Sequence, residues 1–227
     1  FSKNDIHTMY HIPLDRIDVV YNGCNNDFKP ISDKEKEEIR NQYAKGEEYF
    51  LFVGAIHKRK NLVNIFKAFD KYKDDSGAAT KLIIVGNKKW WRGEIEDTYL
   101  SMKYKDDVIF LGRLSPNELG KMMSASLGLV YASLFEGFGI PIVEAFHSET
   151  AVITSNLTSM PEVAGDAALL VDPYSVEQIA DAMFRLKNNP DLRDDLINKG
   201  KKQREKFTWD KTADNLWASI EKVLKTL

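Results

Sequence analysis

The sequence holds little of what would define several common classes of protein. Its 227 residues include one cysteine, Cys24, so no disulfide can form within the chain, which is typical of a reducing compartment. No apolar run approaches the length of a transmembrane helix, and no signal peptide is visible. Lys and Arg together number 32 against 34 Asp and Glu. The two signs are interleaved, so nothing in the charge pattern indicates a nucleic-acid partner.

Several motifs of cofactor binding and catalysis are absent as well. No G-x-G-x-x-G follows a predicted strand and no G-x-x-x-x-G-K-[ST] occurs, which argues against an NAD-type site and a P-loop NTPase. The absence of G-x-S-x-G argues against an acyl hydrolase. The four histidines show no metal-ligand spacing: His7, His11, His57 and His147.

Short apolar runs alternate with longer amphipathic stretches along most of the chain. The runs are mostly β-branched or aromatic, as expected of strands buried on both faces of a parallel sheet: residues 17–21, 49–54, 81–86, 107–112, 127–132, 151–154 and 168–172. Helical patterns lie between them: residues 61–72, 94–105, 116–124, 141–148 and 176–187. This alternation predicts a Rossmann-like, doubly wound α/β domain with about six mostly parallel strands. Further helices are predicted toward the two ends: residues 2–11, 32–43, 191–206 and 209–224.

Two carboxylates eight positions apart form the most informative motif. Glu136 is expected on a loop after a predicted strand, and Glu144 in the first turn of the next helix. Gly137 and Gly139 allow a tight bend and close approach of a ligand, and Pro141 suits the first helical position. The helix N-terminus can bind a phosphate, and the carboxylates can accept hydrogen bonds from sugar hydroxyls. The unit therefore predicts a site for a nucleotide-sugar diphosphate, although a surface Glu and a helix-capping acid would show the same spacing.

Basic residues follow another predicted strand. That strand ends at Gly54, and Lys60 lies before the next helix, where a Lys can neutralise a diphosphate leaving group. Arg59 could add a second positive charge. The alternative is that Lys58, Arg59 and Lys60 form a solvated turn.

Further polar candidates lie at other strand ends. Ser155 and Asn156 could meet a phosphate or a base edge, or could cap a helix. Arg113 could approach the base or the phosphates, or form a surface salt bridge. Trp90 and Trp91 could bind carbohydrate or membrane, but such a pair more often covers the start of a helix.

These motifs together resemble one enzyme family. The unit from Glu136 to Glu144 resembles the E-x7-E motif of the retaining glycosyltransferases of family 4, which have the GT-B fold. Other segments resemble that family in the same order from about Val19 onward: residues 52–54 with 59–61, 108–114 with 118–119, 154–156, 160–163, 165–168 and 171–173. An ordered set of motifs is far more specific than any one of them.

The resemblance implies roles for individual residues. Glu136 would contact the hexose hydroxyls, Glu144 would bind the ribose, and Lys60 would stabilise the departing diphosphate. The family often has an Arg directly after the glycine of its first strand. Here that position is Ala55, so Arg59 is the candidate for the missing charge. The other residues expected to bind the donor are Gly54, Arg113, Gly137, Phe138, Gly139, Ser155 and Asn156. The family needs neither a metal nor another cofactor.

The resemblance also implies an organisation and a setting. Residues 1–30 would be the end of an N-terminal domain and a linker, 31–206 the nucleotide-sugar-binding domain, and 207–227 a helix that crosses back. The chain would be the donor-binding half of the enzyme, inactive alone, and the absent domain would bind a carbohydrate or lipid-linked acceptor. The donor would be GDP- or UDP-linked, with a mannosyl-type sugar. The expected setting is polysaccharide or glycolipid synthesis in the cytoplasm, peripheral to the inner face of the membrane. The alternative is a non-catalytic domain that binds a nucleotide-sugar or a protein partner.

Overall fold

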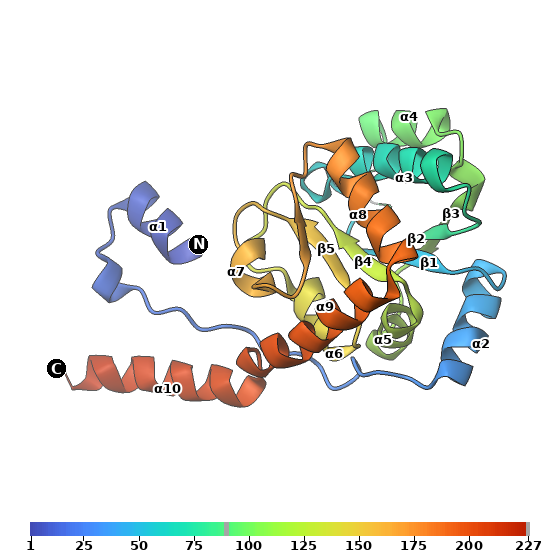
Figure 1. Cartoon of the computed structure of the whole chain (residues 1–227). Coiled ribbons are helices and arrows are strands. Elements are labelled where there is room, and N and C mark those ends of the chain that lie inside the picture. Colours follow the sequence, from blue (N-terminus) through green and yellow to red (C-terminus); the bar gives the residue numbers. More distant parts are fainter. Residues whose placement is uncertain (89–90, 226–227) are drawn as a thin grey trace.

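The computed structural model describes residues 1–88 and 91–225. Its centre is a six-stranded sheet in the order β3-β2-β1-β4-β5-β6 (Figure 1), with every neighbouring pair parallel. The strands are β1 (Tyr49–Val53), β2 (Lys81–Val85), β3 (Val108–Gly112), β4 (Gly128–Tyr131), β5 (Val152–Ser155) and β6 (Leu169–Val171). The predicted doubly wound, parallel sheet is confirmed, and its switch point lies between β1 and β4.

The strands form where they do because both of their faces are buried. Along β1, Phe50 and Phe52 belong to one hydrophobic core, whereas Tyr49, Leu51 and Val53 belong to the other. This alternation follows the two-residue period of a strand. A run that is apolar at every position is therefore buried on both sides of the sheet.

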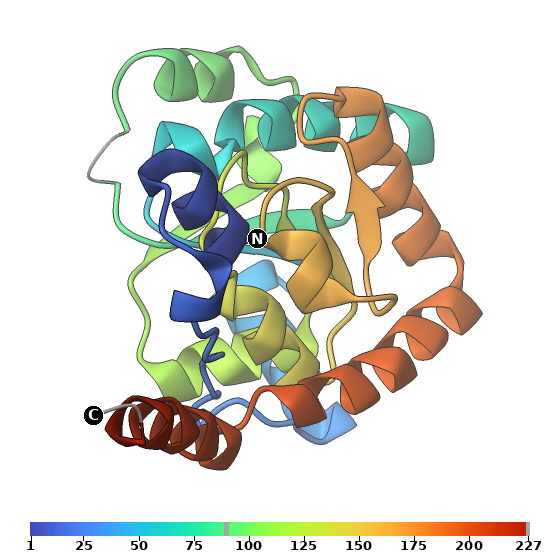
Figure 2. The same ribbon diagram turned by 90° about the vertical axis from the view of Figure 1, so that its left-hand side faces the viewer.

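Helices cover both faces of the sheet (Figures 1 and 2). Helices α3 (Leu62–Ser76), α4 (Glu94–Ser101) and α8 (Val176–Asn188) contribute to the first core. Helices α2 (Asp33–Ala44), α5 (Pro116–Ala125), α6 (Ile140–His147) and α7 (Met160–Ala164) contribute to the second. Helix α9 (Pro190–Gln203) contacts both α6 and α8. Capping boxes begin α2 and α5, at Ser32 with Glu35 and at Ser115 with Glu118.

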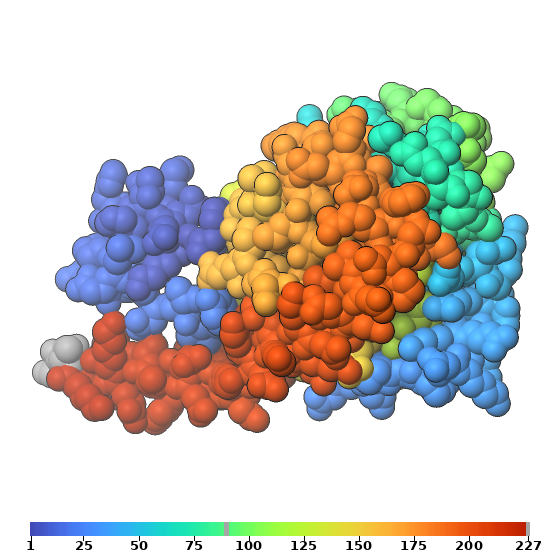
Figure 3. Space-filling model, in the orientation of Figure 1, coloured from blue at the N-terminus to red at the C-terminus, as the bar shows by residue number. Residues whose placement is uncertain are grey.

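The two ends of the chain project from the same side of this domain (Figures 1 and 3). They are the N-terminal arm, defined here as residues 1–23 and including α1 (Ser2–Tyr10), and the helix α10 (Trp209–Leu224). Neither α1 nor α10 has a buried residue, and the apolar side chains of Trp209, Leu216 and Ile220 on the last helix are exposed. Among the described residues, no helix is long and apolar enough to cross a membrane.

The predicted strand at residues 17–21 is wrong. This segment joins no sheet, because it runs beside α10 and its polar groups bind that helix instead. Thr212 Oγ1 donates to the Tyr21 carbonyl at 2.7 Å, and Ser219 Oγ donates to Asp18 at 2.8 Å. Side chains of a helix therefore replace the neighbouring strand that the apolar pattern suggested.

The tryptophan pair is only partly described. Trp90 lies outside the described residues. The ring of Trp91 packs against Phe110, with centroids 5.0 Å apart, and against Tyr99 at 5.3 Å. Trp91 therefore packs over β3 and against α4, which begins three residues later, a structural role like the helix covering considered from the sequence.

Candidate functional site

A buried ion-pair cluster lies at the switch point of the sheet. Lys60 lies in a 3-10 turn, Lys58–Lys60, after β1, and Glu136 lies in the loop after β4. Lys60 Nζ is 2.7 Å from Glu136 Oε1, and Arg59 Nη1 is 2.6 Å from Glu136 Oε2. The side chains of Lys60 and Glu136 are each 9% exposed, whereas that of Arg59 is 48% exposed. One buried carboxylate thus holds two cations from the neighbouring strand end.

The cluster has a fourth member, Tyr131, that sequence reasoning missed. Lys60 Nζ donates to the Tyr131 hydroxyl at 2.6 Å and lies 4.5 Å from the centre of its ring. Tyr131 is the last residue of β4 and is 1% exposed. In the sequence it is simply one more residue of an apolar run. The only signal was a phenol at the carboxyl end of that run.

The charges of this cluster depend on one another. Burial alone would raise the pKa of Glu136, but Lys60 and Arg59 outweigh it and lower the pKa below the ordinary value. Burial lowers the pKa of Lys60, and the ion pair with Glu136 opposes that effect only in part. Lys60 therefore keeps its charge chiefly through the partners that surround it.

Side chains from the loop between β5 and α7 hold the Glu136 loop in place. Ser159 Oγ donates to the carbonyl of Glu136 at 2.8 Å and to that of Phe138 at 2.9 Å. Thr158 Oγ1 accepts from the Glu136 backbone N–H at 3.3 Å. Ser159 precedes α7 but makes no side-chain capping bond to it. Its hydroxyl instead fixes the loop that carries Glu136.

Asn61 fixes the loop that carries the cations. It has a left-handed backbone, φ 62°, and is 4% exposed. Its Nδ2 donates to the Ala132 carbonyl at 2.9 Å and to the Pro173 carbonyl at 2.6 Å. The ends of β4 and β6 are thereby tied to the turn that follows β1, which aims Arg59 and Lys60 at Glu136.

The glycine-rich loop differs in detail from the prediction. Helix α6 begins at Ile140, so Pro141 is its second residue and Glu144 lies in its second turn rather than its first. Gly139 has φ 109°, which favours glycine, but Gly137 is not among the residues with positive φ. A Cβ at Gly137 would have no atom within 4 Å. Only Gly139 is therefore required by the bend, and the space beside Gly137 is open.

A pocket of about 620 Å³ lies beside the cluster, at the carboxyl ends of β1, β2 and β3. It brings together three predicted donor-binding residues, Gly54, Arg113 and Glu144. A Cβ at Gly54 would lie 3.1 Å from Cε of Lys60, so the pocket and the cluster share a wall. The remaining lining residues are Asn25, Phe28, Val53, Ala55, Val85, Gly86, Asn87, Leu114, Ser115, Pro116 and Leu119.

Burial raises the pKa of Glu144 to about 7, from an ordinary value of 4.5. The folded chain therefore keeps this proton to a higher pH than the unfolded chain does. We expect the free energy of unfolding to fall as the pH rises from about 4.5 to about 7, by on the order of 3 kcal/mol from this group. Glu144→Gln should remove that contribution, so urea denaturation at pH 5 and at pH 8 should show a smaller loss than in the unaltered chain. Equal losses in both proteins would contradict the assignment.

Comparison with models of protein families identifies the family of this chain. The model of the family "Glycosyl transferases group 1" matches residues 33–203. The chain belongs to this family. The resemblance seen in the sequence motifs is thereby confirmed.

Relatives of this glycosyltransferase chain include two bacterial enzymes. It is 34% identical over 197 residues to the O-antigen chain mannosyltransferase RfbU of Salmonella typhimurium, covering 82% of this chain and 51% of that protein. It is 28% identical over 211 residues to the O-antigen chain mannosyltransferase B of Escherichia coli, covering 92% and 55%. The chain therefore spans about half the length of these curated relatives.

A solved structure shares the fold of this glycosyltransferase chain. The Anabaena protein HepE, crystallised in complex with UDP and glucose, superimposes with a TM-score of 0.78 at 16% identity. The match covers 92% of this chain and 56% of that one. At this identity the likeness shows the fold.

Five of the residues predicted to bind the donor of the glycosyltransferase do not line the pocket that Glu144 lines: Gly137, Phe138, Gly139, Ser155 and Asn156. Ser155 is 0% exposed, and its hydroxyl accepts from the Leu157 backbone N–H at 3.1 Å. Asn156 is exposed, and its backbone N–H donates to the Val171 carbonyl. Ser155 is the last residue of β5, and every residue of that strand is buried. A role in donor binding stays a prediction for both.

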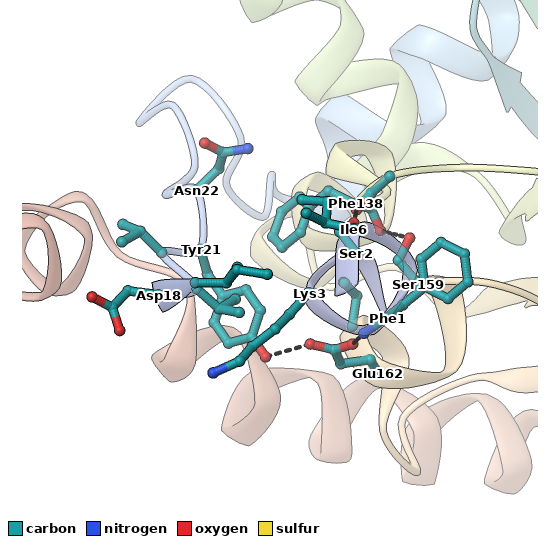
Figure 4. Close-up of a pocket in the computed structure, with 15 residues that line it drawn as sticks. Phe1, Ser2, Lys3, Ile6, Asp18, Tyr21, Asn22, Phe138, Ser159 and Glu162 are labelled. Atoms are coloured by element: carbon teal, nitrogen blue, oxygen red, sulfur yellow. Dashed lines mark hydrogen bonds and ion pairs between the residues drawn. The ribbon is translucent and has the colours of Figure 1, made fainter. Parts of the chain in front are cut away.

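A second cavity, of about 290 Å³, lies between the N-terminal arm and the loop that carries Gly137 and Phe138 (Figure 4). The ring of Phe138 stacks on Tyr21, with centroids 5.9 Å apart. Glu162 accepts a hydrogen bond from the Tyr21 hydroxyl at 2.5 Å and pairs with the amine of Phe1 at 2.6 Å. The Phe138 side chain thus packs against the N-terminal arm, which leaves the main chain of this residue to contact a donor. Among the described residues, no group of three or more His, Cys, Asp or Glu could hold a metal.

Proposed function

We propose that this chain binds a nucleoside diphosphate hexose, of mannosyl type and linked to GDP or UDP, as the donor half of a retaining glycosyltransferase. The observation that carries the proposal is the contact between Lys60 and Glu136 across the switch point, beside the pocket that Glu144 lines. In open α/β sheets, ligands bind at this place. Here it offers two cations, a carboxylate for a sugar and a pocket large enough for a nucleoside.

The proposed chemistry follows from the charges. Negative charge develops on the diphosphate as it leaves the hexose, so fixed positive partners lower the barrier. Lys60 and Arg59 would supply two of these partners, and the positive end of the α6 dipole would add to them. Glu136 would leave its ion pairs and accept hydrogen bonds from the hexose. No metal is needed in this scheme because the neutralising charges are side chains.

The relatives support the choice of sugar and the setting. The two curated relatives are mannosyltransferases of O-antigen chains, which favours a mannosyl donor and a polysaccharide or lipid-linked acceptor. We place the reaction in the cytoplasm, at the inner face of the membrane. Because the chain spans about half of each relative, we propose that the acceptor binds to another domain and that transfer needs both.

Calorimetric titration tests the donor site. We expect the chain to bind GDP or UDP, with their hexose conjugates, in preference to ADP and TDP. Glu144→Ala should weaken the binding of the preferred nucleotide by about 1–3 kcal/mol, because the ribose hydroxyls lose their carboxyl partner. The 2′,3′-dideoxy analogue of that nucleotide should bind the unaltered chain more weakly than the nucleotide itself, by a similar free energy. The Glu144→Ala variant should bind the nucleotide and its dideoxy analogue with equal affinity.

Other outcomes would contradict parts of this proposal. Unchanged nucleotide affinity in Glu144→Ala would refute the ribose assignment. Absence of binding by any of the four nucleotides or their sugars would refute the donor site. We expect negligible transfer to any acceptor by the 227 residues alone, and transfer at the rate of an intact enzyme would refute the need for a second domain.

A further inference from the structure

In this structure the cations of the candidate site are already neutralised. The carboxylate of Glu136 contacts Lys60 through Oε1 and Arg59 through Oε2, so it occupies the place where a diphosphate would sit. If Glu136 turns to a hexose as proposed above, both cations lose this partner. Arg59 is half exposed and can be hydrated, whereas Lys60 is buried. Lys60 therefore needs another polar partner inside the protein.

The Tyr131 hydroxyl is the partner that remains. It accepts from Lys60 Nζ at 2.6 Å, on a side chain that does not depend on the ligand. Tyr131 is 1% exposed and belongs to the second hydrophobic core. Its backbone pairs with Thr154 of β5, and Thr154 Oγ1 donates to its carbonyl at 3.0 Å. The position of the phenol is thus fixed by the centre of the sheet, unlike that of Glu136 on its loop.

We propose that Tyr131 is a positioning residue of the donor site, whose hydroxyl holds the Lys60 ammonium toward the diphosphate when Glu136 is engaged by the sugar. This inference rests on the proposed function and assigns a further residue to the same site. Tyr131 acts through Lys60 and need not touch the donor. A phenol suits the task because it is neutral: it accepts from Lys60 without competing with a diphosphate, as a second carboxylate would.

The protonation of Lys60 gives this role a measurable signature. The charged and titratable groups that face Lys60 are Glu136, Arg59 and Tyr131. Burial and the nearby carboxylate raise the pKa of Tyr131 above its ordinary value, so its hydroxyl stays neutral. Burial already lowers the pKa of Lys60. Without the hydroxyl, the charged form loses an acceptor, and its pKa should fall further.

The test compares diphosphates with nucleosides. Calorimetry is performed on the 227-residue chain and on Tyr131→Phe with GDP, guanosine, UDP and uridine. We expect the affinity for the diphosphate that binds to fall about tenfold, as for a hydrogen bond to a charged group, with nucleoside affinity changed less than twofold. The alkaline loss of diphosphate binding should move to lower pH in the variant. Tyr49→Phe is the matched control, because it removes an equally buried hydroxyl, which donates to the Met122 carbonyl at the other end of β1.

A second measurement separates positioning from general damage to the fold. In a Lys60→Ala background, Tyr131→Phe should cause no further loss of diphosphate affinity, since the residue acts through Lys60. A full additional loss in that background would overturn the inference, as would equal losses for diphosphate and nucleoside. Unchanged binding and an unchanged pH profile in Tyr131→Phe would refute the inference alone. Absence of diphosphate binding by the unaltered chain would refute the donor site itself and the inference with it.

Discussion

Lys60→Ala is expected to weaken nucleoside diphosphate binding by roughly 30- to 150-fold, or about 2–3 kcal/mol. Lys60 is the buried cation of the site, and a buried charge is weakly screened by solvent. The variant leaves Arg59 as the only cation on Glu136 in the described cluster, and half of the Arg59 side chain is exposed. The carboxylate would then repel an incoming diphosphate with less compensation. Calorimetry with GDP and UDP measures the change.

The neighbouring Lys58 provides the control. It lies on the same 3-10 turn and is exposed, so Lys58→Ala changes the net charge by the same amount without touching the cluster. We expect its effect to be severalfold at most and to vanish in high salt. Equal effects of the two substitutions would mean that the turn attracts the ligand only through its overall charge. The proposal that Lys60 itself binds the diphosphate would then be wrong.

Gly86→Ala is expected to destabilise the chain by at least about 3 kcal/mol and to abolish nucleotide binding. Gly86 follows β2 with φ 154°, and its N–H donates to the Gly112 carbonyl at 2.7 Å. A Cβ here would lie 1.8 Å from the Gly54 carbonyl oxygen. The methyl group can fit only if the ends of β1 and β2 separate, and both ends line the pocket. Urea denaturation and calorimetry measure the two effects.

A second glycine substitution serves as the control. Gly137→Ala adds the same methyl group at a position with no atom within 4 Å of the new Cβ and without a positive φ. Its free energy of unfolding should change by no more than about 0.5 kcal/mol. Similar stability of the two variants would show that the approach of Gly86 to Gly54 relaxes freely. The backbone contact would then not require a glycine at position 86.

Much of this fold could be predicted because its strands are buried on both faces. The run at residues 82–85 is apolar at every position, as expected of a short strand that is buried on both faces of a parallel sheet. The meeting of Lys60 and Glu136 could be predicted in outline as well. Each follows a strand, and the carboxyl ends of parallel strands lie at one edge of the sheet.

Other features needed the three-dimensional arrangement. From the sequence, Tyr131 is predicted to be a core residue of a strand. Its position beside Lys60 depends on β1 and β4 being neighbours in the sheet, and the sequence pattern does not give the strand order. Ser155 is a polar residue at a predicted strand end, but only the structure shows that this end of β5 is covered and that the hydroxyl is buried. Residues 17–21 have the pattern of a strand, and only the position of α10 shows where their hydrogen bonds go.

The way the ends of the chain are joined has a mechanical consequence. Gly23 fits against the start of α10 so closely that a Cβ would lie 2.4 Å from the Trp209 nitrogen, and Lys222 Nζ donates to the Asp15 carbonyl near the far end of that helix. The N-terminal arm and α10 are thus joined near both ends of the helix, so we expect them to move as one rigid body. The arm is connected through Cys24 to Asn25 and Phe28, which line the pocket. A torque applied to α10 would therefore reach the pocket that Glu144 lines through a few residues of chain, without first deforming the sheet.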